Sequence, residues 1–415
     1  MKYPKIHYIL SIFICGIPPA LVAGAAIVEL FVILSCLLFF FLNFNKLGTE
    51  YYKKYFFIIF LAFSFFLIFG SFSSQYIQNS LRNTLFYFRF GILILIIWYL
   101  LDHYKKFKFL FFYSLSITLL VVILYSLLQI FVLHNAIHSS RISGLFGEEL
   151  IQGSYLLKIT PIFIAFYYYN KKHLSKNYYF LFNIILLLIY ILIIFSGERA
   201  SIFLMTLGIF LFFIFLKISL KKIFVFAVLF FSIFFLTINL YPLAKDRIIT
   251  ETYNQIFSKD NNSIKINVFS EGHQNHFKTA VIIFEKYYLK GVGVRNFRLE
   301  CQKDAYKDIG RYNCTTHPHN TYMQLLSETG LIGLSFFLFF LIFVCKNSFL
   351  FLKKNYTKNK KINKSLAFCF IAILVNFFPF ITTGSFFNNW LTTLYCLPVA
   401  ILLYELSSKK NNFNE

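Results

Sequence analysis

The sequence of 415 residues is poor in charged side chains. Asp, Glu, Lys and Arg make up only 14% of it, whereas soluble globular proteins carry about 25%. This shortage excludes a soluble enzyme and a disordered chain, and seven Cys are too few for a disulfide scaffold of this length. Hydrophobic residues account for 58% of the chain, and 59 residues are Phe. The composition therefore predicts an all-α polytopic membrane protein.

Apolar runs recur along the chain, each about as long as a helix that crosses a bilayer. The first run resembles a signal peptide, but no convincing cleavage site follows it and a second run comes at once, so we expect a retained helix. We predict about twelve transmembrane helices, at 7–23, 26–44, 54–72, 83–101, 108–133, 152–169, 177–195, 200–217, 222–241, 323–345, 364–383 and 388–404.

The basic residues are distributed unevenly among the connections between these helices. The termini and alternate short connections carry 23 Lys and no Arg, whereas the opposite short loops carry only Arg82, Arg141 and Arg199. By the positive-inside rule, both termini are cytoplasmic and the opposite loops are external. The net charge of +23 therefore reflects membrane topology, and we expect no nucleic-acid partner.

This topology divides the chain into three regions. Residues 1–241 form a nine-helix transmembrane region, residues 242–322 form one large external loop between spans 9 and 10, and residues 323–415 form a three-helix region with a cytoplasmic tail. The large loop is the one soluble-like stretch, and it holds four His and two Cys. We expect the chemistry of the protein to be concentrated there.

Arginine is confined to the predicted external side or to spans near it, and its planar guanidinium suits phosphate oxygens. Arg199 follows a very short turn at the membrane rim, where a lipid-linked phosphate would lie. The alternative is a snorkelling Arg paired with Glu198. Arg141 opens a stretch with Gly144 and Gly147, which indicates either a shaped re-entrant loop or an ordinary turn.

A glycine-rich stretch in the large loop, Gly291-Val292-Gly293, is followed by Arg295 and Arg298. Such a stretch could present backbone N–H groups and guanidiniums to a diphosphate. It lacks the third Gly and the preceding strand of a dinucleotide-binding motif, and it is not a P-loop.

The four loop histidines are His273, His276, His317 and His319. Their spacing matches neither a zinc finger nor a metalloprotease motif, so we expect no metal. A histidine has a pKa suited to proton transfer near neutral pH, and His319 stands where the chain enters span 10.

A polar stripe begins directly after His319. Asn320, Gln324 and Glu328 recur every four residues and therefore share one face of the incoming helix. Polar groups inside a membrane are costly unless they line a cavity, so we expect a cavity with His319 at its mouth.

Cys301 and Cys314 both lie in the large loop. In an oxidising compartment we expect them to pair, which would stabilise the loop by roughly 3 kcal/mol and hold Arg311 and the 317–320 segment near Arg298. Two free thiols are the alternative.

These residues resemble a known family. His319-Asn320, nine residues, Gly330, two residues and Gly333 resemble the signature of the bacterial O-antigen ligases, members of the O-antigen ligase/polymerase superfamily. The upstream Gly291-Val292-Gly293 with Asn296-Phe297-Arg298 is similar too, as are the twelve spans and the large loop. The resemblance implies a multi-pass protein of the bacterial inner membrane with its active site on the periplasmic face.

The resemblance also implies a metal-independent glycosyltransferase without a cofactor. Its partners would be a glycan donor linked to undecaprenyl diphosphate, a lipid A–core acceptor and membrane lipids. The alternatives are a polymerase of O-antigen or capsular polysaccharide and, more remotely, a polysaccharide transporter or flippase. For the ligase we expect an inverting reaction, in which Arg199, Arg295, Arg298 and Arg311 bind the diphosphate, His319 is the base with Glu328 or Asn320 orienting it, and Arg141, His276 and His317 are accessory.

Overall fold

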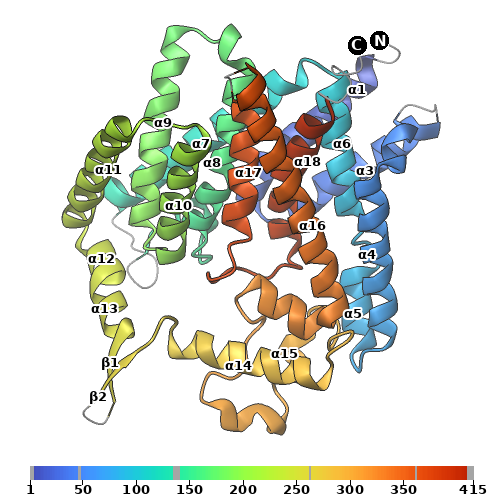
Figure 1. The fold of residues 1–415 in the computed structure, drawn as a ribbon, viewed down its shortest axis with the longest axis vertical. Coiled ribbons are helices and arrows are strands. Elements are labelled where there is room, and N and C mark those ends of the chain that lie inside the picture. The colour runs from blue at the N-terminus through green and yellow to red at the C-terminus, as the bar shows by residue number, and fades with distance from the viewer. Residues whose placement is uncertain (1–3, 45–47, 134–140, 261–262, 360–361, 409–415) are drawn as a thin grey trace.

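The chain folds into a bundle of helices, which Figure 1 shows as a ribbon. The computed structural model describes residues 4–44, 48–133, 141–260, 263–359 and 362–408. The first part of the bundle consists of α1 (Pro4–Cys15), α2 (Ile17–Ala23), α3 (Ala25–Phe44), η1 (Thr49–Lys53), α4 (Tyr55–Phe72), α5 (Ile77–Thr84), α6 (Arg89–His103), α7 (Phe107–Leu128), η2 (Gln129–Leu133), η3 (Gly144–Phe146), α8 (Gln152–Asn170), η4 (Lys171–His173), α9 (Lys176–Phe195), α10 (Arg199–Phe215) and α11 (Leu220–Leu240).

The second part begins with short elements and ends with long helices. The short elements are α12 (Pro242–Lys245), η5 (Asp246–Thr250), α13 (Glu251–Ile256), β1 (Phe257–Asp260), β2 (Ser263–Ile266), α14 (Glu271–Lys286), α15 (Phe297–Glu300) and η6 (Asp304–Ile309). The strands β1 and β2 form an antiparallel hairpin in which Phe257 is opposite Ile266. The bundle is completed by α16 (Thr321–Asn359), α17 (Lys364–Asn376) and α18 (Asn389–Ser408).

Nine helical segments of the described chain are long and apolar enough to cross a membrane, so the protein is a multi-pass helical membrane protein. A helix lies at each of the twelve predicted positions, but α10 and α17 are shorter than a usual span, and α8, which contains Lys158, is not among the nine. The number of helices that cross the bilayer stays a prediction. The nine segments are Lys5–Ala23, Ala25–Leu42, Tyr55–Phe72, Ile77–His103, Phe107–Leu133, Lys176–Phe195, Leu220–Leu240, Thr321–Lys354 and Asn389–Ser407.

The core of the bundle lies where α6, α8, α17 and α18 pack together. Large side chains such as Phe90, Tyr155 and Phe163 are fully buried there. The outer helices instead expose apolar residues: Phe69 on α4 is 68% exposed and Phe224 on α11 is 70% exposed. Exposed apolar side chains of this size fit a lipid environment rather than water.

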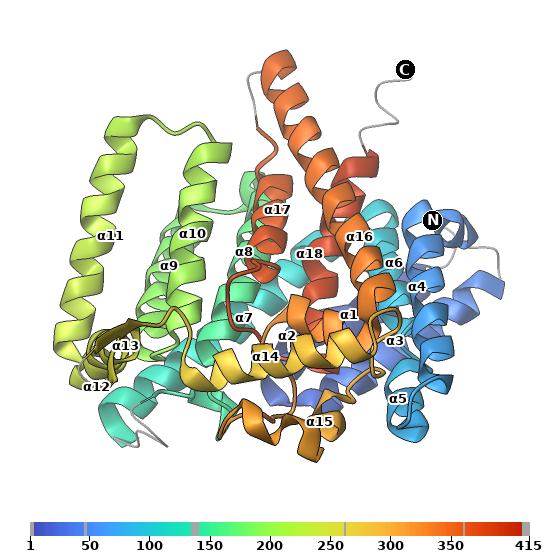
Figure 2. The ribbon, with the colours of Figure 1, turned by 60° about the horizontal axis from the view of Figure 1, so that its bottom comes forward.

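The start of α1 and the end of α18 lie at one end of the bundle, and the segment from α12 to η6 lies at the other (Figures 1 and 2). Within this segment, α14 runs across the end of the bundle, beside the first turns of α16. The segment thus forms a layer over the helix ends, and which side of the membrane it faces stays a prediction.

The helix predicted at 364–383 ends early, so that prediction is wrong in its second half. α17 ends at Asn376, and residues 377–388 form a non-helical loop before α18. Pro379 disfavours helical backbone in the residue before it. The loop carbonyls instead accept hydrogen bonds from the start of α16: Asn320 Nδ2 donates to Pro379 O (2.8 Å) and Ile381 O (3.1 Å), and Tyr322 Oη donates to Phe377 O (2.6 Å).

α16 is kinked at Gly330, which has φ 64° and ψ −165°. Its backbone touches the 288–293 segment there: Gly293 N donates to Glu328 O (3.0 Å) and Leu331 N donates to Tyr288 O (2.8 Å). A Cβ on Gly330 would lie 2.4 Å from the carbonyl carbon of Leu289, and one on Gly291 would lie 2.3 Å from that of Glu328. Both glycines are therefore required because two backbones meet at this kink.

Candidate functional site

Four histidines from two distant segments meet at the end of the bundle where α14 lies. The ring of His319 is 4.1 Å from that of His317, 5.4 Å from that of His273 and 5.5 Å from that of His276, measured between ring centroids. His273 and His276 lie in the first turns of α14, which Ser270 caps by accepting a hydrogen bond from His273 N (3.5 Å). We call these four residues the histidine cluster.

The loop between α17 and α18 holds the second pair of histidines in place. Thr383 N donates to His319 O (2.8 Å), and the His317 Nε2 atom lies 3.3 Å from Thr383 O. Asn320 caps α16, because its Oδ1 accepts hydrogen bonds from Tyr322 N (2.9 Å) and Met323 N (3.1 Å). Asn320 thus fixes both the helix start and the loop beside His319.

His319 has a left-handed backbone conformation, with φ 56°. Among the described residues other than Gly, only Lys217 and Arg295 share a positive φ. This conformation costs about 1–2 kcal/mol for a residue with a Cβ, and such strain is concentrated at functional sites. His319 and Arg295 are therefore marked out by backbone geometry as well as by chemistry.

All four histidines of the cluster are neutral at neutral pH. Burial, together with the other three rings, lowers the pKa of His319 to about 3. Burial likewise lowers the pKa of His317 and of His276 to about 4, and it lowers the pKa of His273. Because positive neighbours add to the shift, an anion placed here would raise each pKa again. Within the described ranges no three His, Cys, Asp or Glu are grouped as a metal site.

One arginine group lies on the α10 side of the histidine cluster and consists of Arg141, Arg199 and Arg247. They gather around Gly197, where a Cβ would lie 3.2 Å from Arg247 Cγ and 3.4 Å from Arg141 Cγ. Arg199 Nη1 donates to Thr252 Oγ1 (3.1 Å), and the charge of Arg199 contributes to the lowered pKa of His273. We call these three residues the first arginine group.

Glu198 does not pair with Arg199. Its Oε1 accepts a hydrogen bond from Gly153 N (2.7 Å) and its Oε2 accepts one from Ser154 N (3.0 Å), at the N-terminus of α8. Arg141 Nη2 is 3.9 Å from the same carboxylate. The alternative of a snorkelling Arg199 paired with Glu198 is therefore wrong, and Arg199 keeps its guanidinium on the side of His273.

A second arginine group consists of Arg295 and Arg298, which follow the glycine-rich stretch. Arg295 Nη1 donates to Asn83 Oδ1 at the end of α5 (2.9 Å). The Nε atom of Arg298 is buried and has no hydrogen-bond partner among the described residues. Both guanidiniums contribute to the lowered pKa of His317. The first arginine group thus acts electrostatically on His273, and the second acts on His317.

The polar stripe on α16 is fully engaged with protein groups. Gln324 Nε2 donates to Glu328 Oε2 and to Ser385 Oγ (both 2.9 Å), and Gln324 Oε1 accepts from Phe386 N (2.8 Å). Glu328, which is fully buried, accepts from Phe297 N (3.3 Å). The prediction that this stripe lines a cavity is wrong, because the 377–388 loop and the 291–297 turn satisfy its polar atoms.

Glu328 and the glycine-rich stretch both make hydrogen bonds within the protein. Glu328 makes no hydrogen bond to His319; it holds the turn that carries the second arginine group. The N–H groups of Val292 and Gly293 donate to Ser327 O (2.9 Å) and Glu328 O. The prediction that these N–H groups bind a diphosphate is wrong, since they are used within the protein.

Cys301 and Cys314 are joined by a disulfide, as expected from their place in the loop. Arg311 lies within the loop that this disulfide closes. It is exposed, and its guanidinium lies over the ring of its neighbour Tyr312, 5.5 Å from the centroid. The structure thus places Arg295 and Arg298 where their charges act on His317. It shows no contact between Arg311 and the histidine cluster.

Sequence reasoning missed two parts of the site. Arg247 joins the first arginine group from η5, and its one signal in the sequence was its place among the external arginines. The 377–388 loop was taken for part of a helix because it is rich in Phe and Ile, although Pro379 and Gly384 indicated a break.

Part of the chain matches a family model. Residues 184–338 match the model described as O-Antigen ligase. The matched range runs from α9 into α16, so it contains Arg199, Arg247, the histidine cluster, the second arginine group and Glu328. A search of curated proteins gives no match.

Proposed function

Because residues 184–338 match the O-antigen ligase family model, we propose that the chain is a membrane glycosyltransferase of the ligase type. It moves a glycan from undecaprenyl diphosphate to a sugar hydroxyl of a lipid A–core acceptor, on the periplasmic face of the bacterial inner membrane. The observation that carries this proposal is the cluster of four neutral histidine rings, with arginines that act electrostatically on His273 and on His317. That arrangement joins a proton acceptor to binding groups for an anionic leaving group.

The arginines neutralise the leaving group. As the bond between the anomeric carbon and the diphosphate breaks, negative charge grows on the departing oxygen, and fixed guanidiniums stabilise it. We assign this role to Arg199, which acts electrostatically on His273, and to Arg298, whose buried Nε has no hydrogen-bond partner among the described residues. Arg141, Arg247 and Arg295 support them.

His319 accepts the proton of the acceptor hydroxyl. The hydroxyl oxygen attacks the anomeric carbon from the face opposite the diphosphate, its proton passes to the free ring nitrogen, and the bonding electrons leave with the diphosphate. One displacement inverts the anomeric carbon. The pKa of about 3 in the ligand-free site leaves the ring unprotonated, and the bound diphosphate raises this pKa towards the range in which a base works well.

The neighbouring residues position these groups. Asn320 fixes the 317–320 turn against the 377–388 loop. Glu328 fixes the turn of Arg295 and Arg298 through Phe297 N. His317 and His276 surround His319 and keep water out of the site. Asn320 and Glu328 therefore act through other residues, and we assign them positioning roles.

Deletion of the gene, followed by lipopolysaccharide profiling, tests this proposal. A ligase deletion leaves core-only lipopolysaccharide while long polymer accumulates on the lipid carrier, and wild type but not His319→Ala restores the polymer. Lipopolysaccharide with a single repeat unit would show instead that polymerisation is the lost step. An unchanged profile would contradict both activities and favour transport.

A further inference from the structure

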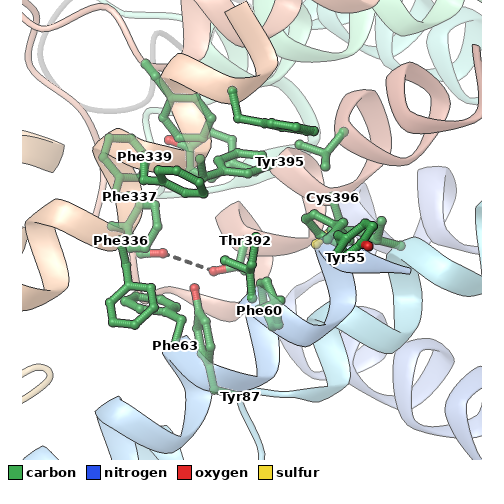
Figure 3. Close-up of a pocket in the computed structure, with 18 of the residues that line it drawn as sticks. Tyr55, Phe60, Phe63, Tyr87, Phe336, Phe337, Phe339, Thr392, Tyr395 and Cys396 are labelled. Atoms are coloured by element: carbon green, nitrogen blue, oxygen red, sulfur yellow. Dashed lines mark hydrogen bonds between the residues drawn. The ribbon is translucent and has the colours of Figure 1, made fainter. Parts of the chain in front are cut away.

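A cavity of about 450 Å³ lies between α4, α6, α16 and α18, apart from the histidine cluster (Figure 3). Most of the residues that line it are aromatic, and Thr392 uses its hydroxyl to donate to Phe386 O (3.0 Å). The lining includes Phe60, Phe63, Tyr87, Phe336, Phe339 and Tyr395. A wall of this kind fits a hydrocarbon chain and offers little to a polar ligand.

One end of the cavity lies at the 377–388 loop. Phe377 and Phe386 line it, and both belong to the loop that holds His317, His319 and Asn320. From there it follows α16 from Phe336 to Asn347, which is about 17 Å of helix at about 1.5 Å per residue. Its far end reaches the first turn of α4, which directly follows η1.

The cavity is also accessible from the side of the bundle. Tyr55 is 85% exposed and Phe339 is 57% exposed, although both contribute to its lining. These residues lie on helices that are apolar enough to cross a membrane. A lipid chain can therefore enter laterally from the bilayer.

We infer that this cavity binds the polyprenyl chain of the donor; this inference rests on the proposed function. A lipid anchored at the histidine cluster must pass one leaflet, about 15 Å of hydrocarbon, before it reaches the far half of the bundle. An acyl chain of that leaflet ends near the midplane. An undecaprenyl chain is longer than the whole bilayer is thick when extended, so it can fill a cavity along the far half of α16.

Photocrosslinking of the full chain tests which lipid occupies the cavity. Phe339 lines the cavity, whereas Phe349 lies on the same helix outside it, and the two are 57% and 56% exposed. Each is replaced in turn by a benzophenone amino acid, in phospholipid nanodiscs that contain undecaprenyl diphosphate. We expect undecaprenyl adducts at position 339 and phospholipid adducts at position 349. Phospholipid adducts alone at both positions, or equal undecaprenyl adducts at both, would overturn the inference.

A kinetic experiment separates this inference from the proposed function. Val399 lines the cavity and is 4% exposed, so Val399→Trp fills part of it. Donors that carry the same glycan on undecaprenyl or on short geranyl diphosphate are compared. The ratio of their kcat/KM values should fall at least about tenfold in the variant, because fewer isoprene units remain buried.

Failure of the cavity assignment and failure of the proposed function would give different results. An unchanged ratio would overturn the assignment of the cavity while transfer itself stands. Absence of transfer from either donor by the wild type would overturn the proposed function, and the crosslinks would still decide what occupies the cavity.

Discussion

At the scale of single residues, His319 combines an unusual backbone with an unusual environment. Its φ of 56° is one that a glycine adopts freely, yet the position holds a large ring among three others. The strain is offset by the hydrogen bond from Thr383 N to His319 O. Such an arrangement is explained if the ring itself is needed at this place.

Replacement of His319 by Gly and by Ala separates the ring from the backbone. Both variants should lose transfer by at least about 10²-fold, because both lack the proton acceptor. His319→Gly should be more stable than His319→Ala by about 1 kcal/mol, since only Ala keeps the left-handed strain. Thermal unfolding and transfer rates measure the two effects. Activity retained in the Gly variant would show that the position has a conformational role only.

The low pKa values of the histidine cluster predict a response to anions. Without ligand, the pKa of His319 is about 3, below its ordinary 6.5, so acid protonates the unfolded chain first and stability is lost as the pH falls below about 6.5. Inorganic diphosphate should raise the pKa of His319, and also those of His317 and His276, from about 4. Titration of labelled histidine rings by NMR measures this, with His103 near η1 as an internal control. Equal pKa values of the cluster histidines with and without diphosphate would contradict an anion-binding site.

At the scale of elements, the site depends on contacts that stabilise a kink in one helix and the early end of another. The kink of α16 at Gly330 opens backbone groups that the 288–293 segment satisfies, and this places the turn that carries Arg295 and Arg298 beside the polar stripe. The 377–388 loop satisfies the start of the same helix. The site is thus built where one helix is interrupted and another ends early.

Gly330→Ala tests the kink. Its Cβ would lie 2.4 Å from backbone of Leu289, and φ 64° disfavours any Cβ. We expect a loss of several kcal/mol in stability and loss of transfer. Gly70→Ala in α4 is the matched control, because nothing lies within 4 Å of a Cβ there, and it should leave both properties nearly unchanged. Equal behaviour of the two variants would show that the backbone contact at the kink is dispensable.

The sequence predicted the elements better than their interruptions. Apolar runs place a helix at every predicted position, and the O-antigen ligase signature is confirmed by the family match. The end of α17 at Asn376 depends on hydrogen bonds from Asn320 and Tyr322, more than 50 residues away, and periodicity carries no such information. The same holds for Arg247, which reaches the first arginine group only through the packing of η5 against the turn at Gly197.

At the scale of the whole molecule, the distribution of basic residues among the connections agrees with the arrangement of the helices. The start of α1 and the end of α18 lie at the end of the bundle opposite to α14, which carries His273 and His276 (Figure 1). The lysine-rich connections alternate with the arginine-bearing ones along the chain. The positive-inside rule then predicts that the histidine cluster faces the periplasm.

Labelling of single introduced cysteines tests this orientation. Lys105, between α6 and α7, and Lys307, in η6, lie on opposite predicted sides. In intact spheroplasts, a membrane-impermeant maleimide should label Lys307→Cys at once and Lys105→Cys only after permeabilisation. The parent chain without introduced cysteines is the control. The reverse pattern would place the site in the cytoplasm and contradict the account.

Glycan transfer by the purified chain in proteoliposomes tests the central claim most directly. The donor is a glycan on undecaprenyl diphosphate, the acceptor is lipid A–core, and the anomeric configuration of the product is read by NMR. The account predicts transfer with inversion, in the presence of a metal chelator, by wild type and not by His319→Ala or by Arg199→Ala. Transfer with retention, or full activity of the His319→Ala variant, would contradict the assignment of the histidine cluster and its arginine groups as the site of the reaction.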